Sequence, residues 1–410
     1  MSPSAMLFKG LIIILATVSF SRQEEVRYGD LVTNFVVPED AKLLVPELIR
    51  KYGYPCEVHT VVSKDGYVLE MHRIPFGKSG PSENRPAVYL QHGILASSAD
   101  WVLKQDTGLG YVLADAGYDV WMPNVRGTRY SRKHITLDPD NDASKFWDFS
   151  WHEIAVDDVP TMVDYVIDTV KQEQIFYIGH SQGTTIFYVM CSELPEYNGK
   201  IRAMFSFSPV AWMGHMTSPL LRIVAMANWF VGPFLNLIGV HELLPQHSFF
   251  AEIGDKLCGD NSFLQPLCTN ALFAICGFNP KQMNASLIPT IMGHTPAGAA
   301  TKQLLHFAQE VNSGHFRKYD YGFFRNIAKY GSISPPKYKL KKVTAPVYLH
   351  YSRNDWISNE KDVIKLSREL GNVKGKFLIL DDRFNHVDFV YGIDAYQLLY
   401  LRVLGLMKRH

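Results

Sequence analysis

Short apolar runs alternate with helix-like segments through residues 67–210 of the chain. The helix-like segment at 151–171 carries apolar side chains three and four residues apart, as at Val156, Val159 and Val163. Short buried strands separated by helices are typical of parallel sheets with both faces covered. The pattern therefore predicts a mostly parallel, doubly wound α/β sheet. Its expected strands lie at residues 67–74, 87–91, 119–122, 175–178 and 203–207.

The alternation stops near residue 211 and resumes with apolar runs at 345–351 and 376–380. The residues between are rich in Met, Phe, Pro and Gly and show no clear strand pattern. We expect one sheet domain, formed by 22–211 and 337–410, that is interrupted by a mainly helical insertion at 212–336. Two independent domains are a weaker alternative, because the last two strands would then have no sheet to join.

The N-terminus has the pattern of an export signal. Lys9 precedes an apolar stretch at 10–20, and Ser21 is followed by a charged segment. A single positive charge, a short apolar stretch and small residues before the cleavage site are typical of a secretory signal peptide. The alternative is a membrane anchor, but the stretch is shorter than the roughly 20 residues that a spanning helix needs. We therefore expect a signal peptide at 1–21 and a secreted or lysosomal protein without a membrane span.

Composition narrows the possible partners. With 47% hydrophobic residues in a chain of 410, the protein can bury a substantial core, which excludes intrinsic disorder. The 41 basic and 40 acidic side chains are interspersed and nearly cancel. Because no long-range positive field results, we expect no nucleic-acid partner. The chain is expected to be a monomer.

The five cysteines form an odd set for an oxidising compartment. Cys258 and Cys268 bracket a short polar segment and are the natural local disulfide pair. Cys191 and Cys276 lie in apolar runs, where a cysteine usually behaves as a small buried apolar residue. Cys56 has no role that its surroundings suggest.

Two further patterns concern modification and metal binding. Asn284 begins an Asn-Ala-Ser sequon, which predicts a glycosylated loop at the surface. The cysteines lack the tandem spacing of a zinc site, and the 15 histidines form no HExxH motif. We expect neither a metal nor a cofactor.

A G-x-S-x-G pentapeptide at 179–183 is the strongest chemical signal in the chain. A strand-like run at 174–178 precedes it, and an apolar run that can form a helix follows at 184–190. Strand, sharp turn and helix make up a nucleophile elbow, which exposes the serine hydroxyl at the edge of a sheet. The sequence therefore predicts Ser181 as a catalytic nucleophile.

A serine nucleophile needs a base, and the base needs a carboxylate to orient it. In folds with a nucleophile elbow, the chain order is serine, acid and histidine, each after its own strand. Asp355 follows the strand-like run at 345–351, and His386 follows the run at 376–380. The assignment of the base is firmer than that of the acid. Other carboxyl side chains lie nearby, at Asp381, Asp382 and Asp388.

The oxyanion of an acyl-transfer intermediate needs two backbone donors. One is expected from the residue after the nucleophile, Gln182, which opens the helix. The other is expected from the loop after an early strand, where His92-Gly93 follows the run at 87–91. Within that loop we expect the N–H group of Ile94 to be the donor.

Taken together, these motifs make the chain resemble the acid lipase family of gastric and lysosomal lipases. The resemblance implies an α/β-hydrolase fold with a helical cap or lid in the insertion at 212–336. It also implies Ser181 as nucleophile, Asp355 as acid, His386 as base, and Ile94 with Gln182 as oxyanion donors. The cap of the family has a disulfide where Cys258 and Cys268 stand. The motifs are Gly53-Tyr54-Pro55, Asp65-Gly66-Tyr67, His92-Gly93, Asn124-x-Arg126-Gly127, the stretch Gly-His-Ser-Gln-Gly-Thr-Thr at 179–185, and Asn385-His386-x-Asp388-Phe389.

The expected activity is hydrolysis of neutral lipid esters, such as triacylglycerols or steryl esters, at a lipid–water interface. Apolar stretches at 220–231 and 233–238 suit either the packing of the cap itself or an interfacial surface and acyl-chain tunnel. A carboxylesterase for smaller soluble esters is a second hypothesis. A catalytically silent lipid carrier is a third, although such proteins usually lose a triad residue. Epoxide hydrolases of this fold place aspartate at the elbow, where this chain has Ser181.

Overall fold

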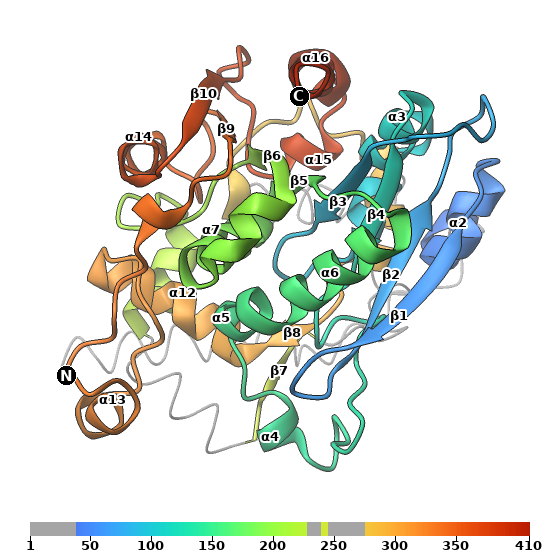
Figure 1. Ribbon diagram of the computed structural model, residues 1–410. Helices are drawn as coiled ribbons and strands as arrows, with labels where there is room; N and C mark the ends of the chain where they lie inside the picture. The colour runs from blue at the N-terminus through green and yellow to red at the C-terminus, as the bar shows by residue number, and fades with distance from the viewer. Residues whose placement is uncertain (1–37, 228–238, 245–274) are drawn as a thin grey trace, which may run out of the picture. The chain divides into compact units, whose positions relative to one another are not determined.

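The computed structural model describes residues 38–227, 239–244 and 275–410 (Figure 1). Its central feature is an eight-stranded sheet that contains all seven predicted strands. The expected signal peptide at 1–21 and the pair Cys258 and Cys268 lie outside the described residues. The strands of the sheet are β1 (Glu57–Val62), β2 (Val68–Ile74), β3 (Ala87–Gln91), β4 (Asp119–Pro123), β5 (Ile175–His180), β6 (Ile201–Phe207), β9 (Val347–Tyr351) and β10 (Val373–Leu378).

The strand order of the sheet is β1-β2-β4-β3-β5-β6-β9-β10. The pairs β1–β2 and β2–β4 are antiparallel, and the other five pairs are parallel. The prediction of a mostly parallel sheet is therefore confirmed. The carboxyl ends of parallel strands lie along one edge, where ligand sites of such sheets are found. The loops after β3, β5, β6, β9 and β10 consequently meet at that edge.

The edge strand β1 escaped the sequence analysis for a physical reason. Its residues are exposed or half-buried throughout, and it begins with the charged residue Glu57. In contrast, every residue of β3, β4, β5 and β9 is buried. An apolar run therefore predicts a central strand, whereas an edge strand in contact with water keeps polar side chains.

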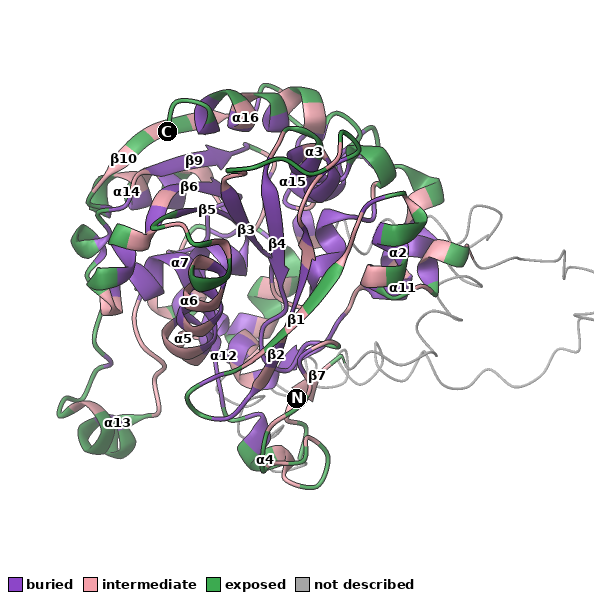
Figure 2. Ribbon diagram, turned by 45° about the vertical axis from the view of Figure 1, so that its right-hand side comes forward, coloured by how far each residue is buried: buried purple, intermediate pink, exposed green. Residues whose placement is uncertain are grey.

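Alternate residues of the strands belong to two apolar clusters, one on each face of the sheet. Tyr89 and Tyr177 contribute to one cluster, together with residues of α5, α6, α7 and α14. Val88 and Ile178 contribute to the other, together with residues of α2, α3, α15 and α16. Figure 2 shows the buried strands between these helices. The helices are α2 (Val45–Lys51), α3 (Leu109–Asp115), α4 (Ala143–Phe146), α5 (Trp151–Glu153), α6 (Val159–Val170), α7 (Gln182–Glu193), α14 (Glu360–Glu369), α15 (Asp388–Tyr391) and α16 (Leu401–Met407).

The helix predicted at 151–171 is present but is not uniform. It consists of α5, a π-helical turn at Ile154–Asp158, and α6, which ends at Val170 and is followed by Lys171 with a positive φ of 56°. Apolar spacing alone cannot reveal the turn, because its residues Ile154 and Ala155 still face the core. Such turns commonly occur near functional sites.

The described part of residues 212–336, where the sequence predicts an insertion, contains both helices and a small sheet. Strand β7 (Glu242–Leu243) pairs with β8 (Ala299–Ala300) in antiparallel fashion. The insertion contacts the loop after β3 where Ala297 N–H donates to the carbonyl of Leu95 at 2.7 Å. It contacts α5 where the rings of Trp151 and His306 stack with centroids 3.7 Å apart. Its helices include α11 (Ile288–His294), α12 (Thr301–Ser313) and α13 (Phe323–Tyr330).

Candidate active site

Ser181 occupies a sharp turn between β5 and α7. It has φ 53° and ψ −121°, a combination that non-glycine residues rarely adopt. The turn is held from β6, because Ser181 N–H donates to the carbonyl of Phe207 at 3.1 Å. Strained backbone of this kind persists only where the surrounding structure enforces it, and it clusters at functional sites. The geometry is that of a nucleophile elbow.

Both glycines of the pentapeptide are required by close backbone contacts. A Cβ on Gly179 would lie 2.8 Å from the carbonyl carbon of Gly183. A Cβ on Gly183 would lie 2.4 Å from the carbonyl oxygen of Gln91, at the end of β3. Helix α7 therefore begins close against the sheet only because neither position has a side chain.

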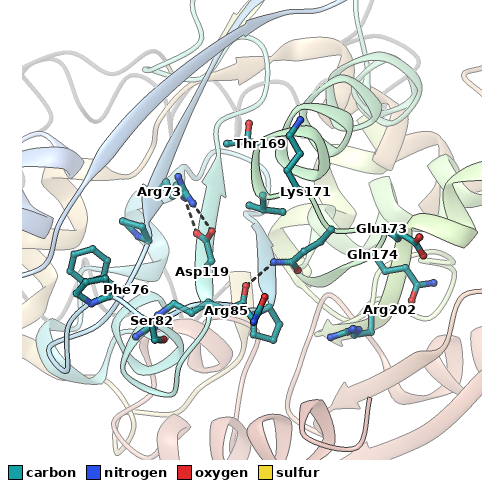
Figure 3. A pocket seen from close by; sticks show the side chains of 16 residues that line it. Arg73, Phe76, Ser82, Arg85, Asp119, Thr169, Lys171, Glu173, Gln174 and Arg202 are labelled. Carbon is teal, nitrogen blue, oxygen red and sulfur yellow. Dashed lines mark hydrogen bonds and ion pairs between the residues drawn. The ribbon is translucent and has the colours of Figure 1, made fainter.

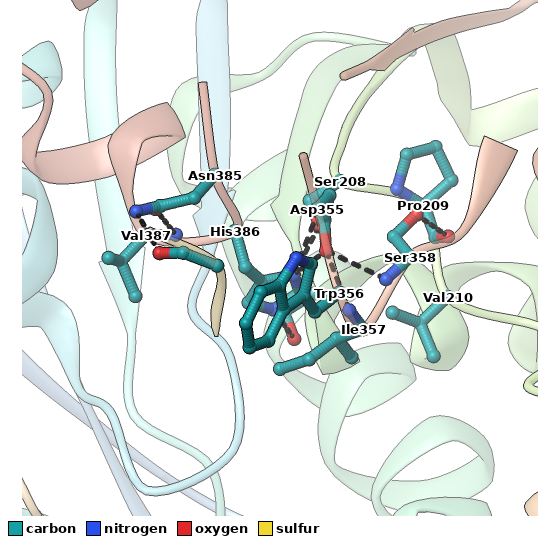
Figure 4. Close-up of polar contacts among 12 residues, drawn as sticks. Ser208, Pro209, Val210, Asp355, Trp356, Ile357, Ser358, Asn385, His386 and Val387 are labelled. Carbon is teal, nitrogen blue, oxygen red and sulfur yellow. Dashed lines mark hydrogen bonds and ion pairs between the residues drawn. The ribbon is translucent and has the colours of Figure 1, made fainter. Parts of the chain in front are cut away.

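His386 connects Ser181 to Asp355 through hydrogen bonds. Its Nε2 atom lies 2.8 Å from Oγ of Ser181. Its Nδ1 atom lies 3.0 Å and 3.1 Å from the two carboxylate oxygens of Asp355. The loops after β5, β9 and β10 each supply one of these residues. Figure 4 shows His386 and Asp355, with Ser208 beside them. Residues far apart in sequence thus form the nucleophile–base–acid arrangement of a catalytic triad.

The carboxylate of Asp355 is fully buried and has several donors. The N–H groups of Ile357 and Ser358 donate to Oδ1 at 3.0 Å and 2.8 Å, and the hydroxyl of Ser208 donates to Oδ2. Burial alone would raise the pKa of Asp355. The charge of His386 and the hydrogen bonds from His386, Ser208 and Ser358 outweigh the effect of burial. They hold the pKa of Asp355 below its ordinary value. The site therefore keeps the carboxylate ionised beside His386.

Ser208 is a member of this network that sequence reasoning missed. Its hydroxyl oxygen also lies 2.6 Å from Nδ1 of His386. It has a positive φ of 52°, and its N–H donates to the carbonyl of His350 at 3.0 Å. The signal that could have found it is its position directly after β6, between the strands that precede Ser181 and Asp355.

The other nearby carboxyl groups have partners of their own. Asp382 pairs with Arg353 at 2.9 Å, and Asp381 accepts the N–H of Arg383 at 2.9 Å. Asp388 accepts from the N–H of Asn385 at 2.8 Å, and burial raises its pKa to about 7. Among the described contacts, His386 bonds to no carboxylate other than Asp355.

The expected oxyanion donors lie beside Ser181. Gln182 is the first residue of α7, and Ile94 lies in the loop after β3. A Cβ on Gly93 would be 3.2 Å from Cβ of Ser181, so this loop passes directly over the nucleophile. Neither the Gln182 nor the Ile94 N–H donates a hydrogen bond within the described parts of the chain. Ile94 and Gln182 thus stay the predicted oxyanion donors.

His180 supports the loop of His386 from the nucleophile side. Its Nε2 atom lies 2.8 Å from the carbonyl oxygen of His386, and a hydrogen bond to a carbonyl requires a proton on Nε2. Burial, together with the neighbouring His386, lowers the pKa of His180 to about 3. The ring is consequently neutral and does not compete with His386 for the serine proton.

The segment 276–279 lies between the acid and base loops. The carbonyl of Cys276 accepts from the N–H groups of both Trp356, at 3.4 Å, and His386, at 3.3 Å. The carbonyl of Gly277 accepts from Nδ2 of Asn385 at 2.9 Å. The backbone of segment 276–279 thus links the loops of Asp355 and His386 to each other.

The remaining predicted residues have varied surroundings. Cys191 and Cys276 are free and buried, as the sequence predicted, and Cys56 is free and half-buried. Burial raises the pKa of the Cys56 thiol to about 11. Asn284 is exposed, and its side chain accepts from the hydroxyl of Ser286 at 2.7 Å.

The described residues contain no cluster of His, Cys, Asp and Glu that could hold a metal ion. No helix among them has the length and apolar character needed to cross a bilayer. A cavity of about 690 Å³ is lined by Arg73, Asp119 and Arg202 among others (Figure 3). Asp119 and Arg202 lie near the amino ends of β4 and β6, so this cavity is at the edge of the sheet opposite Ser181.

Comparison with known proteins places this geometry in a family. Residues 86–392 match the family model of the alpha/beta hydrolase fold, and residues 45–105 match that of a partial alpha/beta-hydrolase lipase region. Lipase 3 of Drosophila melanogaster is 45% identical, over 89% of this chain and 92% of that relative. Human lysosomal acid lipase/cholesteryl ester hydrolase is 35% identical, over 99% of both chains.

A solved structure supports the fold alone. The crystal structure of a lipase candidate from Sulfolobus solfataricus has a TM-score of 0.58 at 13% identity, covering 91% of this chain and 98% of that chain. The chain belongs to the acid lipase family of α/β-hydrolases, and it is a carboxylic ester hydrolase.

Proposed function

We propose that this protein hydrolyses neutral lipid esters, such as triacylglycerols or steryl esters, through an acyl-enzyme formed on Ser181. The observation that carries the proposal is the continuous hydrogen-bond chain from Ser181 through His386 to Asp355. No cofactor takes part in the reaction. The relatives named above as a lipase and as a cholesteryl ester hydrolase support the class of substrate.

The reaction proceeds in two acyl transfers. His386 Nε2 takes the hydroxyl proton of Ser181 as Oγ attacks the ester carbonyl carbon, and the carbonyl oxygen becomes an oxyanion. As the tetrahedral intermediate collapses, the bond to the alcohol oxygen breaks and that oxygen takes the proton from Nε2. Water then gives a proton to Nε2 and attacks the acyl carbon. As this second intermediate collapses, the bond from the acyl carbon to Oγ breaks, Oγ takes the proton back from Nε2, and the fatty acid leaves.

The oxyanion is stabilised by the N–H groups of Ile94 and Gln182. Gln182 opens α7, where the helix dipole adds positive potential. Asp355 stays ionised during the reaction, fixes the tautomer of His386 and stabilises the imidazolium that forms. Ser208 strengthens this arrangement through its hydrogen bond to the carboxylate.

The cap that admits the acyl chain lies within the insertion at 212–336, near its first helical segment. The helical segment that begins at residue 219 exposes Leu220, Ile223 and Met226, which are spaced three residues apart. Residues three apart are neighbours on a helix surface, so Leu220 adjoins Ile223 and Ile223 adjoins Met226. Such an apolar face supports contact with a lipid chain more than with a small soluble ester.

Labelling with a fluorophosphonate tests the nucleophile. Wild-type protein should form one adduct on Ser181, and the Ser181→Ala variant should form none. Ser352→Ala is the matched control, because Ser352 is a buried serine whose hydroxyl has no partner among the described residues. A folded wild-type protein that does not react would contradict the proposal and favour a silent lipid carrier.

A substrate comparison separates lipase from carboxylesterase. Rates on emulsified long-chain triacylglycerol and on steryl ester should exceed those on soluble short-chain esters when each is expressed as kcat/KM. A clear preference for monomeric soluble esters would instead identify a carboxylesterase.

Export and maturation complete the proposal. The chain loses residues 1–21, is secreted or delivered to lysosomes, and acts as a monomer. Cys258 pairs with Cys268, and Asn284 is glycosylated. Mass spectrometry of the mature protein, before and after reduction and enzymatic deglycosylation, tests the cleavage, the disulfide and the glycan, and size-exclusion chromatography tests the monomer.

A further inference from the structure

The segment between Arg317 and Lys337 leaves the body of the protein and returns to it. Arg317 and Lys337 form an antiparallel bridge at its base, and Lys318 N–H donates to the carbonyl of Pro336 at 2.9 Å. This segment, the 317–337 excursion, contains α13. In both ribbon views α13 lies apart from the other labelled helices, and its surface is largely exposed (Figures 1 and 2).

The helix of the excursion turns its apolar side toward water. Phe324 is 83% exposed, Phe323 52% and Ile327 44%, and Ile333 after the helix is 59% exposed. The rings of Phe323 and Phe324 meet edge to face at 5.0 Å. A surface helix of a globular protein normally shows the reverse pattern, with its apolar stripe against the core.

A buried polar residue causes this orientation. Asn326 is 1% exposed, and its side-chain oxygen accepts from Tyr321 N–H at 2.9 Å. Its amide nitrogen donates to Asp320 at 2.7 Å and to the carbonyl of Ile333 at 2.8 Å. These bonds fix the orientation of α13. Phe323 and Phe324 are therefore exposed in this structure, and no rearrangement of the helix is needed to expose them.

The excursion is also strongly basic, although the whole chain is almost neutral. Residues 317–337 contain five basic side chains and one acidic side chain, against 41 and 40 in the full chain. Asp320 pairs with Arg317, and Lys318 pairs with Glu193. The exposed cations that pair with no described carboxylate are Arg325, Lys329 and Lys337.

We propose that the 317–337 excursion docks the protein on an anionic phospholipid surface. Phe323, Phe324 and Ile327 insert among the acyl chains, while Arg325 and Lys329 meet the negatively charged headgroups. Aromatic and aliphatic side chains on one face with basic residues beside them are typical of helices that lie in a membrane interface. The role given to docking rests on the proposed lipid-ester hydrolysis, because docking would bring the cap to a lipid substrate. The binding itself does not require catalysis.

Co-sedimentation of the full chain with vesicles tests this surface. The vesicles contain phosphatidylcholine, either alone or mixed with phosphatidylserine. The wild-type protein should bind the mixed vesicles more strongly. The double variant Phe323→Ser/Phe324→Ser should bind them at least about tenfold more weakly, since two rings no longer leave water. Arg325→Glu should remove most of the preference for phosphatidylserine.

The matched control is Ile135→Ser, which changes a 64% exposed apolar residue elsewhere on the protein. It should bind vesicles as the wild type does, and all variants should cleave a soluble short-chain ester at the wild-type rate. Wild-type binding by the double variant would overturn the docking proposal even if the enzyme cleaves lipid. Vesicle binding by a protein that cleaves no ester would leave docking intact and contradict the proposed function.

Discussion

The hydroxyl group of Ser208 donates a hydrogen bond to the carboxylate of Asp355. Because the same hydroxyl oxygen lies 2.6 Å from Nδ1 of His386, Ser208 contacts both the acid and the base. Three donors besides His386 thus serve one buried carboxylate. Each donor favours the ionised form, and together with His386 they keep the pKa of Asp355 low.

Ser208→Ala should reduce kcat on a soluble ester by about tenfold or more and leave KM unchanged. A hydrogen bond to a charged group contributes about 1.5–3 kcal/mol, and RT ln 10 is about 1.4 kcal/mol. Loss of a donor to the ionised form raises the pKa of Asp355. At a given acidic pH more of the carboxyl is then protonated, so the acid limb of the kcat profile should move to higher pH.

The matched control for this variant is Ser352→Ala. Ser352 lies close to Asp355 in the chain and is buried, but its hydroxyl has no hydrogen-bond partner among the described residues. Its pH profile should coincide with that of the wild type. If both variants gave the same acid limb, Ser208 would have no specific effect on Asp355.

Gly277→Ala should impair both folding and turnover. Gly277 has φ 113°, and a Cβ there would lie 2.1 Å from the carbonyl oxygen of Asn354. The clash and the left-handed backbone together should lower the free energy of unfolding by at least about 2 kcal/mol. Because the carbonyl of Gly277 also holds Asn385, displacement of this segment should move the base loop and lower kcat.

Gly314→Ala separates the clash from the backbone strain. Gly314 also has a positive φ, of 63°, but no heavy atom lies within 4 Å of the added Cβ. It should lose only about 1 kcal/mol of stability and keep wild-type kcat. Equal kcat in the two variants, measured beside urea denaturation curves, would show that segment 276–279 does not position the triad.

Arg126→Met should destabilise the protein severely. Arg126 is buried, and its Nε donates to the fully buried carboxylate of Asp158 at 2.7 Å. Its guanidinium also lies over the ring of Tyr67 at 4.0 Å. Removal of one partner of a buried ion pair leaves an uncompensated charge and costs about 3–5 kcal/mol.

A second substitution tests the cause. Adding Asp158→Asn to Arg126→Met removes the orphaned charge while keeping the shape of the side chain. The double variant should therefore have a higher urea midpoint than Arg126→Met alone. A lower midpoint would mean that lost packing, rather than the unpaired charge, dominates the effect.

The sequence predicted those strands whose complete burial produces a continuous run of apolar residues. A strand such as β5 is buried at every position, so its apolar run stands out, and the elbow at Ser181 follows because backbone proximity demands Gly179 and Gly183. Strand β1 meets water and has no such run. The pair β7–β8 has two residues per strand, too few for a period to show.

The supporting residues of the site could not be predicted in the same way. Ser208 is an ordinary loop serine in the sequence, and its contact with Asp355 exists because β6 lies between β5 and β9. Gly277 matters because the insertion returns to the core between two distant loops. Such roles depend on long-range contacts that local spacing does not encode.

His350 should make the protein less stable in acid. It lies in β9 and is fully buried, and burial, followed by the nearby charge of Arg402, lowers its pKa to about 3. In the unfolded chain a histidine has a pKa of about 6.5. Between these values the unfolded state binds more protons, so stability from this residue is complete above about pH 6.5 and falls as pH decreases. The loss is about 1.4 kcal/mol per pH unit down to about pH 3.

His350→Phe should remove this pH dependence. The ring of His350 stacks on Phe377 at 5.2 Å and meets Phe207 edge-on at 5.7 Å, so a phenyl ring suits its surroundings. Neither imidazole nitrogen has a partner at full hydrogen-bond geometry among the described residues, although the backbone groups of Ser206 and Tyr348 act on the ring against the lowering of its pKa. Urea denaturation at pH 7.5 should give the variant at least wild-type stability. At pH 5 the variant should exceed the wild type by about 2 kcal/mol more than at pH 7.5. An equal difference at both pH values would show that His350 does not titrate on unfolding.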